Sequence, residues 1–182
     1  MLVALLPSPY LPPAHPEPKP MFDFKPQAGA DAATVWEDVL SAVDGVTKGE
    51  PDPIANMANV AALLWELVPD LNWAGFYRMV SGELVLGPFQ GRAACIRIAL
   101  GSGVCGTAAA TGETQLVEDV HAFPGHIACD AASASELVVP IVIAGRIEGV
   151  LDLDSPTPAR FTAEDAAGAE RLCALLSERL AG

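Results

Sequence analysis

The sequence predicts an α+β fold, in which a central antiparallel sheet of about six strands is flanked by N-terminal and C-terminal helices. Two observations support this prediction. Near both ends of the chain, in residues 31–46, 54–68 and 162–180, apolar side chains recur at helical spacing. Between them, short apolar runs alternate with turn residues such as Ser81-Gly82 and Ala144-Gly145, which is typical of hairpins.

The predicted helices have clear ends in the sequence. A break over residues 45–53 separates the first two helices, and Pro69 ends the second. A third helix, rich in small residues, begins near Gly103 and closes at Gly112. Thr162 caps the last helix, whose first turn is acidic.

The strands are short, and so are most of the connections between them. The exception is residues 120–135, and an irregular loop of this length in a compact domain tends to be functional. The predicted strands are residues 73–80, 83–89, 95–100, 114–120, 137–144 and 146–154.

Composition narrows the class of protein. The net charge of −13 argues against nucleic acid and anionic membranes as partners, and it suits a ligand with a cationic group. No apolar run approaches the roughly 20 residues of a membrane helix, and the first residues lack the basic start of a signal peptide. We therefore expect a cytoplasmic protein with one domain, in which cysteines serve catalysis, redox sensing or metal binding rather than structural disulfides.

Residues 1–29 differ in character from the domain predicted over residues 30–182. Seven prolines fall within residues 1–20, where almost nothing is able to pack, and Met21 follows directly. We interpret residues 1–29 as a disordered or mis-assigned N-terminal tail and assign no function to it.

Three of the four cysteines, Cys95, Cys105 and Cys129, gather in the middle of the chain. They fit a redox relay, a metal site or inert packing. The fourth, Cys173, lies on the apolar stripe of the last predicted helix, so we expect it to fill the core.

Of these three interpretations, the metal site has little support in the sequence. It would combine Cys129 with His121 and His126, but the spacing is loose and lacks a paired C-x-x-C unit. We therefore expect no bound metal and no cofactor.

Acidic side chains mark the last predicted strand. Because side chains alternate between the faces of a strand, Asp152 and Asp154 share a face. Aspartates are poor strand formers and costly to bury unpaired. Pairing across the Ala144-Gly145 turn brings Glu136 to the same end of the sheet, so three carboxylates converge beside the loop that carries Cys129.

Six motifs in this chain have counterparts in one enzyme family. They are NWAGFY, GPFQG, GVCG, VEDVHAFPGHIACD, SELVVPI and GVLDLDSP. With them, the chain from Ile54 to its C-terminus resembles the free methionine-(R)-sulfoxide reductase family, whose members have a GAF-type fold. A generic GAF domain has no reason to combine three cysteines at this spacing with the GHIACD and LDLDSP motifs.

The resemblance implies roles for the three cysteines. Cys129 is the attacking residue, Cys95 is the resolving one, and Cys105 is a further redox-active partner. A thiolate that reduces a sulfoxide is left as sulfenic acid, which a second thiol converts to a disulfide. An external dithiol protein, thioredoxin, then resets the enzyme by thiol–disulfide exchange.

The resemblance also implies a substrate site. Trp73 and Tyr77, which share one face of the first predicted strand, match the family's aromatic wall around the substrate methyl group. Because crowded carboxyls cannot all ionise, one of them keeps a proton that it can donate to the sulfoxide oxygen. Glu136, Asp152 and Asp154 match the family's polar groups, and we expect Glu136 and Asp154 to be catalytic and Asp152 to bind the substrate. Apart from the resemblance, we expect Glu118 either to contact the ligand ammonium or to be solvated, and the backbone N–H groups of Ile127 and Ala128 to meet the substrate carboxylate.

The function expected from this resemblance is thioredoxin-dependent reduction of free L-methionine-(R)-S-oxide to L-methionine. A non-catalytic GAF module that binds a ligand or senses oxidants is the main alternative, and a structural zinc domain is the third. The long terminal helices are compatible with a homodimer.

Overall fold

The computed structural model describes residues 29–125 and 132–181. Its helices are α1 (Ala32–Thr47), α2 (Pro53–Leu67), α3 (Gly103–Thr111) and α4 (Ala163–Leu180), with the short 3-10 helix η1 (Val120–Ala122). Its strands are β1 (Trp73–Val80), β2 (Glu83–Gly91), β3 (Arg97–Ile98), β4 (Gln115–Val117), β5 (Ser135–Ile143) and β6 (Arg146–Ser155). They form one antiparallel sheet in the order β3-β2-β1-β6-β5-β4, which confirms the predicted α+β fold with six strands.

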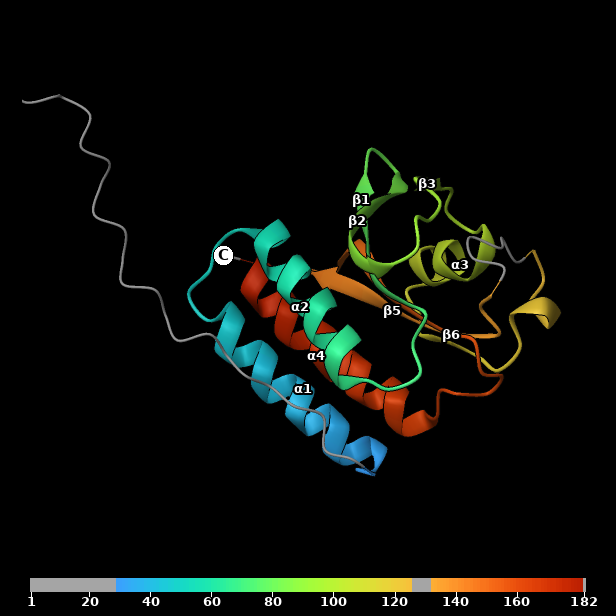
Figure 1. The fold of residues 1–182 in the computed structure, drawn as a ribbon. Coiled ribbons are helices and arrows are strands. Elements are labelled where there is room, and N and C mark those ends of the chain that lie inside the picture. Colours follow the sequence, from blue (N-terminus) through green and yellow to red (C-terminus); the bar gives the residue numbers. More distant parts are fainter. Residues whose placement is uncertain (1–28, 126–131, 182) are drawn as a thin grey trace, which may run out of the picture.

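The sheet separates two apolar layers. Helices α1, α2 and α4 cover one face, and α3 lies on the other (Figure 1). Strand alternation sends Phe76 and Leu153 to the three-helix side, whereas Trp73 and Tyr77 face the side of α3. The α3 side therefore holds the aromatic and acidic residues that the sequence singled out.

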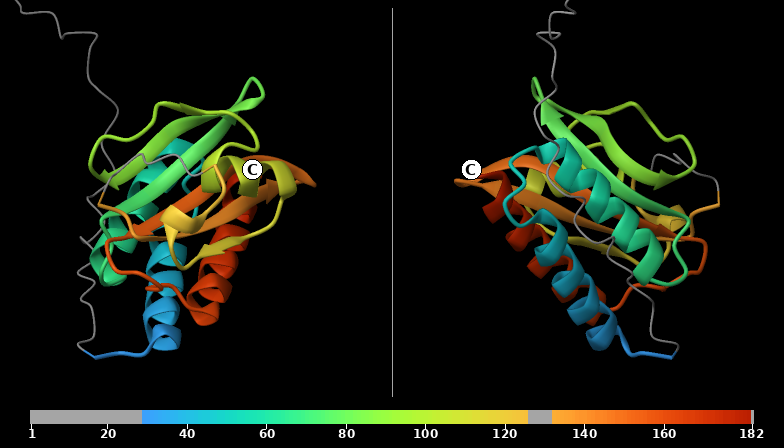
Figure 2. Two further views of the ribbon diagram at one scale, coloured as in Figure 1. Left: turned by 90° about the vertical axis from the view of Figure 1, so that its right-hand side faces the viewer. Right: turned by 60° about the vertical axis from the view of Figure 1, so that its left-hand side comes forward.

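Helices α1 and α4 run side by side, as both views of Figure 2 show, and polar contacts fix their positions. The indole Nε1 of buried Trp36 donates to Asp165 Oδ1 at 3.1 Å. Asp165 also completes the capping box that begins α4 at Thr162. Gly168 leaves room for the Trp36 ring, which a side chain at this position would meet. These contacts anchor the helical layer on which the sheet rests.

A β-bulge in the hairpin of β5 and β6 sets the register of the acidic residues. The hairpin begins with Ile143 opposite Arg146, as predicted, but the ladder shifts by one residue between Ile141 and Val142. Beyond the shift, Glu136 pairs with Asp154. An unbroken ladder would instead place Glu136 opposite Leu153, whose side chain faces the helical layer. The bulge thus keeps Glu136 on the same face as the two aspartates.

Two predicted strands are shorter than expected. The strand predicted over residues 95–100 pairs only at Arg97–Ile98, and the one predicted over 114–120 ends at Val117. Asp119 explains the second difference, because its side chain accepts a hydrogen bond from His121 N and caps η1. In the part of the chain that the structure describes, no helix combines the length and apolar character needed to cross a membrane. The tail prediction falls mostly on residues 1–28, outside the described residues, so the boundary at residue 30 stays a prediction.

Candidate functional site

A thiol and two carboxyls from three different elements meet on the α3 side of the sheet. Cys105 comes from the first turn of α3, Glu136 from the start of β5 and Asp152 from the middle of β6. All three are buried, and the Cys105 Sγ lies 3.8 Å from Glu136 Oε1, to which it donates. Asp152 Oδ1 has no hydrogen-bond partner among the described residues. One buried acceptor is therefore left for a ligand.

Burial shifts both carboxyls toward their neutral forms. It raises the pKa of Asp152 to about 7. The pKa of Glu136 is raised well above its usual value, first by burial and then by the charges of Asp152 and Asp154. Both pKa values are therefore shifted upward, so the two carboxyls keep their protons to a higher pH than exposed carboxyls do. The site thus holds an acidic proton at neutral pH.

The same environment keeps the Cys105 thiol protonated. Burial raises its pKa well above the usual value, and the nearby charges of Asp152 and Glu136 raise it further. A thiol of this kind donates a hydrogen bond more readily than it attacks an electrophile. Cys105 lies at the site as the sequence predicted, and its redox role stays a prediction.

Aromatic rings form one wall beside the acids. Trp73 and Tyr77 are buried and stacked on the same face of β1, with ring centroids 5.9 Å apart. Phe89 of β2 also stacks on Trp73, with ring centroids 5.3 Å apart. Burial raises the pKa of the Tyr77 hydroxyl, and the carboxylates add to this shift. The wall therefore stays apolar and uncharged at physiological pH.

A pocket lies between this wall and the acids. It is lined by Trp73, Tyr77, Arg92, Ala93, Ala94, Asp152 and Asp154. Its volume is about 10 Å³, roughly the space that one water molecule occupies. This space is smaller than a free amino acid, so the pocket has to widen to admit one.

The cysteines differ in state. Cys95 is partly buried and disulfide-bonded, whereas Cys105 and Cys173 are free, buried thiols. Cys173 packs in the core under α4, as predicted. Three predicted site residues, Cys129, Ile127 and Ala128, lie outside the described residues.

The segment that follows the central loop is tied to the strands of the site. Asn72, just before β1, donates from its backbone N to Asp154 O at 3.0 Å and from Nδ2 to Ser133 Oγ at 3.0 Å. Ala134 N donates to Ser155 O at 2.8 Å. These bonds fix residues 133–134 beside the end of β6, two residues before Glu136.

Other predicted residues lie away from this group. Glu118 and His121 are both exposed, and neither lines the pocket. Among the described residues, those whose ligand atoms are close enough to share a metal ion are Cys105, Glu136 and Asp152, all within 4.8 Å of one another. These three side chains would have to lose their protons before they could bind a metal ion, and burial favours their protonated, neutral forms.

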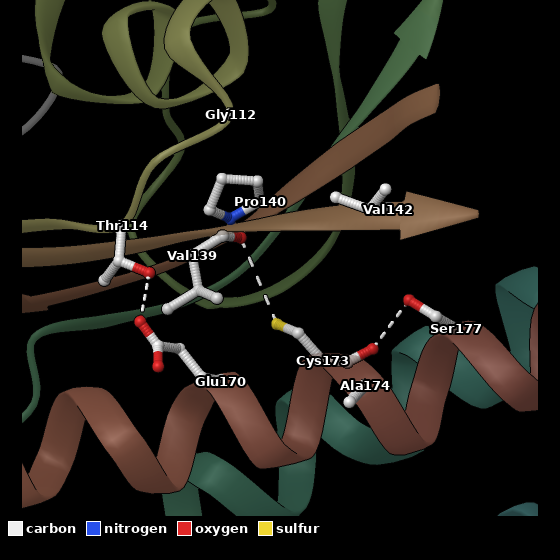
Figure 3. A pocket seen from close by; sticks show the side chains of 9 residues that line it. All are labelled: Gly112, Thr114, Val139, Pro140, Val142, Glu170, Cys173, Ala174 and Ser177. Atoms are coloured by element: carbon white, nitrogen blue, oxygen red, sulfur yellow. Dashed lines mark hydrogen bonds between the residues drawn. The ribbon is translucent and has the colours of Figure 1, made fainter. Parts of the chain in front are cut away.

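A second and larger concavity lies at the edge of β5, beyond the end of β4. Figure 3 shows this groove of about 390 Å³ between β5 and α4. The Cys173 thiol points to Val139 O at 4.0 Å, and Glu170 accepts a hydrogen bond from Thr114 at 2.6 Å. None of its lining residues is a predicted site residue, so the smaller acidic pocket is the better candidate.

Sequence reasoning missed part of the pocket. Phe89 belongs to the GPFQG motif and Arg92 follows it directly. The motif supported the family resemblance, but it did not predict that these two residues lie at the pocket. Their positions depend on the pairing of β1 with β2, which sets Trp73 opposite Gly91. That register was the signal that could have placed both residues beside the aromatic wall.

Comparisons with known proteins point in one direction. The GAF domain family matches residues 57–181. The Escherichia coli protein named free methionine-R-sulfoxide reductase is 51% identical over 146 residues, covering 80% of this chain and 88% of that protein. The Saccharomyces cerevisiae protein of the same name is 43% identical over 152 residues, covering 79% and 84%.

A solved structure agrees with these relatives. The structure of free methionine-R-sulfoxide reductase from Neisseria meningitidis, in complex with its substrate, superposes on this chain with a TM-score of 0.84. It is 45% identical, and the match covers 88% of this chain and 96% of that one.

Proposed function

Because the chain belongs to the GAF-domain family of free methionine-R-sulfoxide reductases, we propose that it reduces free L-methionine-(R)-S-oxide to L-methionine. The observation that carries this proposal is the buried pair Glu136 and Asp152, which holds a proton beside an aromatic pocket. We assign the activity to a catalytic domain over residues 30–182.

The acids protonate the oxygen that leaves the substrate. Glu136 carries the proton, and Asp152 and Asp154 keep it there by disfavouring further negative charge. A neutral carboxyl can donate to the sulfoxide oxygen as the S–O bond weakens. The unpaired Asp152 oxygen and Asp154 then offer acceptors for the substrate ammonium.

The aromatic wall selects the other end of the sulfoxide. The stacked Trp73 and Tyr77 present an apolar surface suited to the S-methyl group, while the acids take the oxygen. The backbone N–H groups of Ile127 and Ala128 meet the substrate carboxylate. Glu118, exposed in the structure, attracts the ammonium from a distance.

The cysteines carry the electrons. The Cys129 thiolate forms a bond to the sulfoxide sulfur while Glu136 protonates the oxygen. The oxygen then passes from the substrate sulfur to the cysteine sulfur as the S–S bond and the S–O bond of the substrate break, so that methionine leaves and Cys129 is left as sulfenic acid. The Cys95 thiol then forms a disulfide with Cys129 and releases water. The disulfide-bonded state of Cys95, with Cys105 and Cys173 free, supports this pairing in a chain of four cysteines.

Thioredoxin closes the cycle. One of its thiolates opens the Cys95 disulfide through a mixed disulfide, and its second thiol completes the exchange. We place this cycle in the cytoplasm, where thioredoxin is kept reduced.

The test is turnover with a complete reducing system. Purified protein, free methionine sulfoxide, thioredoxin, thioredoxin reductase and NADPH should consume NADPH with the R epimer and not with the S epimer. Cys129→Ser should abolish consumption, and the core variant Cys173→Ser serves as the matched control. No consumption by the unaltered protein, or full activity of Cys129→Ser, would contradict the proposal.

An oxidant sensor is the second candidate, because the disulfide-bonded state of Cys95 also suits a protein that records oxidation. A sensor would form its disulfide once with peroxide or sulfoxide and would not turn over. The same assay separates the two functions, since a sensor consumes one equivalent of reductant per protein.

A further inference from the structure

The acidic pocket is lined by one positively charged residue as well as by two aspartates. Asp152 and Asp154 line the pocket together with Arg92. Among the described lining residues, Arg92 is the one cation. A pocket lined by two acids and by an arginine suits a ligand that carries both charges.

Arg92 also differs from most other arginines of the chain. Five of the seven arginines form ion pairs, namely Arg97, Arg146, Arg160, Arg171 and Arg179. Arg92 is exposed, and its guanidinium forms no ion pair with any described residue, although the chain has 23 acidic residues and 10 basic ones. Its charge is therefore available to a ligand.

The backbone of Arg92 is held in place by the aromatic wall. Trp73 Nε1 donates to Arg92 O at 3.1 Å. Trp73 is itself buried and stacks on both Tyr77 and Phe89. The side chain of Arg92 thus starts from a fixed point beside the ring that we assign to the substrate methyl group.

We propose that Arg92 binds the α-carboxylate of the free amino acid, an assignment that rests on the proposed function. The planar guanidinium can donate two parallel N–H bonds to a carboxylate, and such charge-assisted bonds are stronger than neutral ones. Backbone N–H groups offer the carboxylate only partial positive charges. Arg92 adds a full positive charge at the part of the site that binds the carboxylate. A methionine sulfoxide within a polypeptide has no free carboxylate for it.

The test compares a substrate that has the carboxylate with one that lacks it. The probes are methionine-(R)-sulfoxide and its primary amide, which keeps the ammonium and the sulfoxide. With the unaltered enzyme, kcat/KM should be about tenfold higher for the acid than for the amide, mainly through KM. Arg92→Ala should remove this preference by lowering kcat/KM for the acid and leaving the amide unchanged. Arg92→Lys should restore part of it.

Arg97→Ala is the matched control, because Arg97 is an exposed arginine that pairs with Glu83 outside the pocket. It should keep the preference of the unaltered enzyme. Equal losses for acid and amide in Arg92→Ala, or an unchanged preference, would overturn the assignment, since a merely structural role affects both probes alike.

Direct binding separates this inference from the reaction itself. Calorimetry with L-methionine and L-methionine amide on the reduced protein should show the same charge preference and its loss in Arg92→Ala. If the unaltered protein binds the acid preferentially but does not reduce the sulfoxide, the proposed reaction fails and the role of Arg92 stands. Equal binding of acid and amide by the unaltered protein would contradict the role of Arg92 even in an active enzyme.

Discussion

The Cys105 thiol donates to Glu136, with Sγ 3.8 Å from Oε1, and both groups are buried. The pKa of the thiol is raised first by burial and then by the charges of Asp152 and Glu136, so the thiol stays neutral in this position. The sequence alone shows three clustered cysteines, whereas the structure distinguishes one of them as a hydrogen-bond donor within the acidic group.

Cys105 should therefore be slow to alkylate. In the reduced, folded protein at pH 8, iodoacetamide should modify Cys105 at least about tenfold more slowly than the partly buried Cys95, because the thiolate is the reactive form. Mass mapping of peptides over time measures both rates. Buried Cys173 is the matched control and should be equally slow, and all rates should converge in urea. Comparable rates for Cys105 and Cys95 in the folded protein would refute this expectation.

Asp152 should make the protein less stable as the pH rises from about 4 to 7. Its pKa is about 7 in the folded protein against an ordinary value of 3.8, so the folded state binds more protons in this range. Stability falls with pH wherever the folded state holds the extra proton. Asparagine has no proton to lose, so Asp152→Asn does not lose stability in this way. The free energy of unfolding of the variant, relative to that of the unaltered protein, should therefore increase as the pH rises to about 7 and stay constant above it.

Urea denaturation at pH 4.5, 6 and 8 measures the difference. Glu66→Gln, on the exposed side of α2, is the matched control for the loss of one carboxylate and should show no comparable trend. A stability gain in Asp152→Asn that is the same at all three pH values would show that its proton is not the cause.

Trp73 should contribute to the stability of the folded protein. Trp73→Ala removes a buried ring that stacks on Tyr77 and Phe89, and we expect a loss of about 3–5 kcal/mol in the free energy of unfolding. Trp73→Phe keeps an aromatic ring but loses the bond to Arg92 O, which costs about 1 kcal/mol. Chemical denaturation measures both values, and similar losses in the two variants would contradict the role given to the ring stack.

Gly168 should tolerate no side chain, although it lies inside α4. A Cβ atom at this position would approach the Trp36 ring closer than 3.0 Å, and the ring is held by its bond to Asp165. Gly168→Ala should therefore destabilise the protein by about 1–3 kcal/mol through overpacking, despite the better helix propensity of alanine. The activity per folded molecule should not change, because the contact lies in the helical layer.

A double variant checks the cause of that loss. Adding Trp36→Leu should make the combined effect smaller than the sum of the single effects, because the smaller side chain leaves room for the methyl group. Strict additivity, measured by thermal and urea denaturation, would point to a cause other than the clash.

Local patterns were enough to predict most of the fold. The alternation in VLDLD, residues 150–154, is a local property, so it correctly predicted that Asp152 and Asp154 share one face and that Leu153 lies on the other. The two hairpins also follow from short-range turn signals, and the first pair of the second hairpin, Ile143 with Arg146, lies where predicted. Helix ends at Gly112 and Thr162 were readable because capping chemistry is local.

Longer-range relationships were not readable from the sequence. Neither the stack of Phe89 on Trp73 nor the bond between Trp36 and Asp165 has a local signature, because each joins different elements. The strand predicted around Cys95 proved shorter, since pairing with β2 is limited to Arg97–Ile98. Edge pairing of this kind depends on the partner strand rather than on propensity.

The one-residue shift in the β5–β6 hairpin means that β6 has one residue more than β5 between the turn and the pair Glu136–Asp154. Deleting Glu148 from β6 would remove the extra residue and keep Glu136 opposite Asp154 in a regular ladder. Deleting one residue from β5 after Glu136 would instead move Glu136 to the position of Leu137, opposite Leu153 and facing the helical layer. The two strands of this hairpin therefore differ in how they tolerate a deletion.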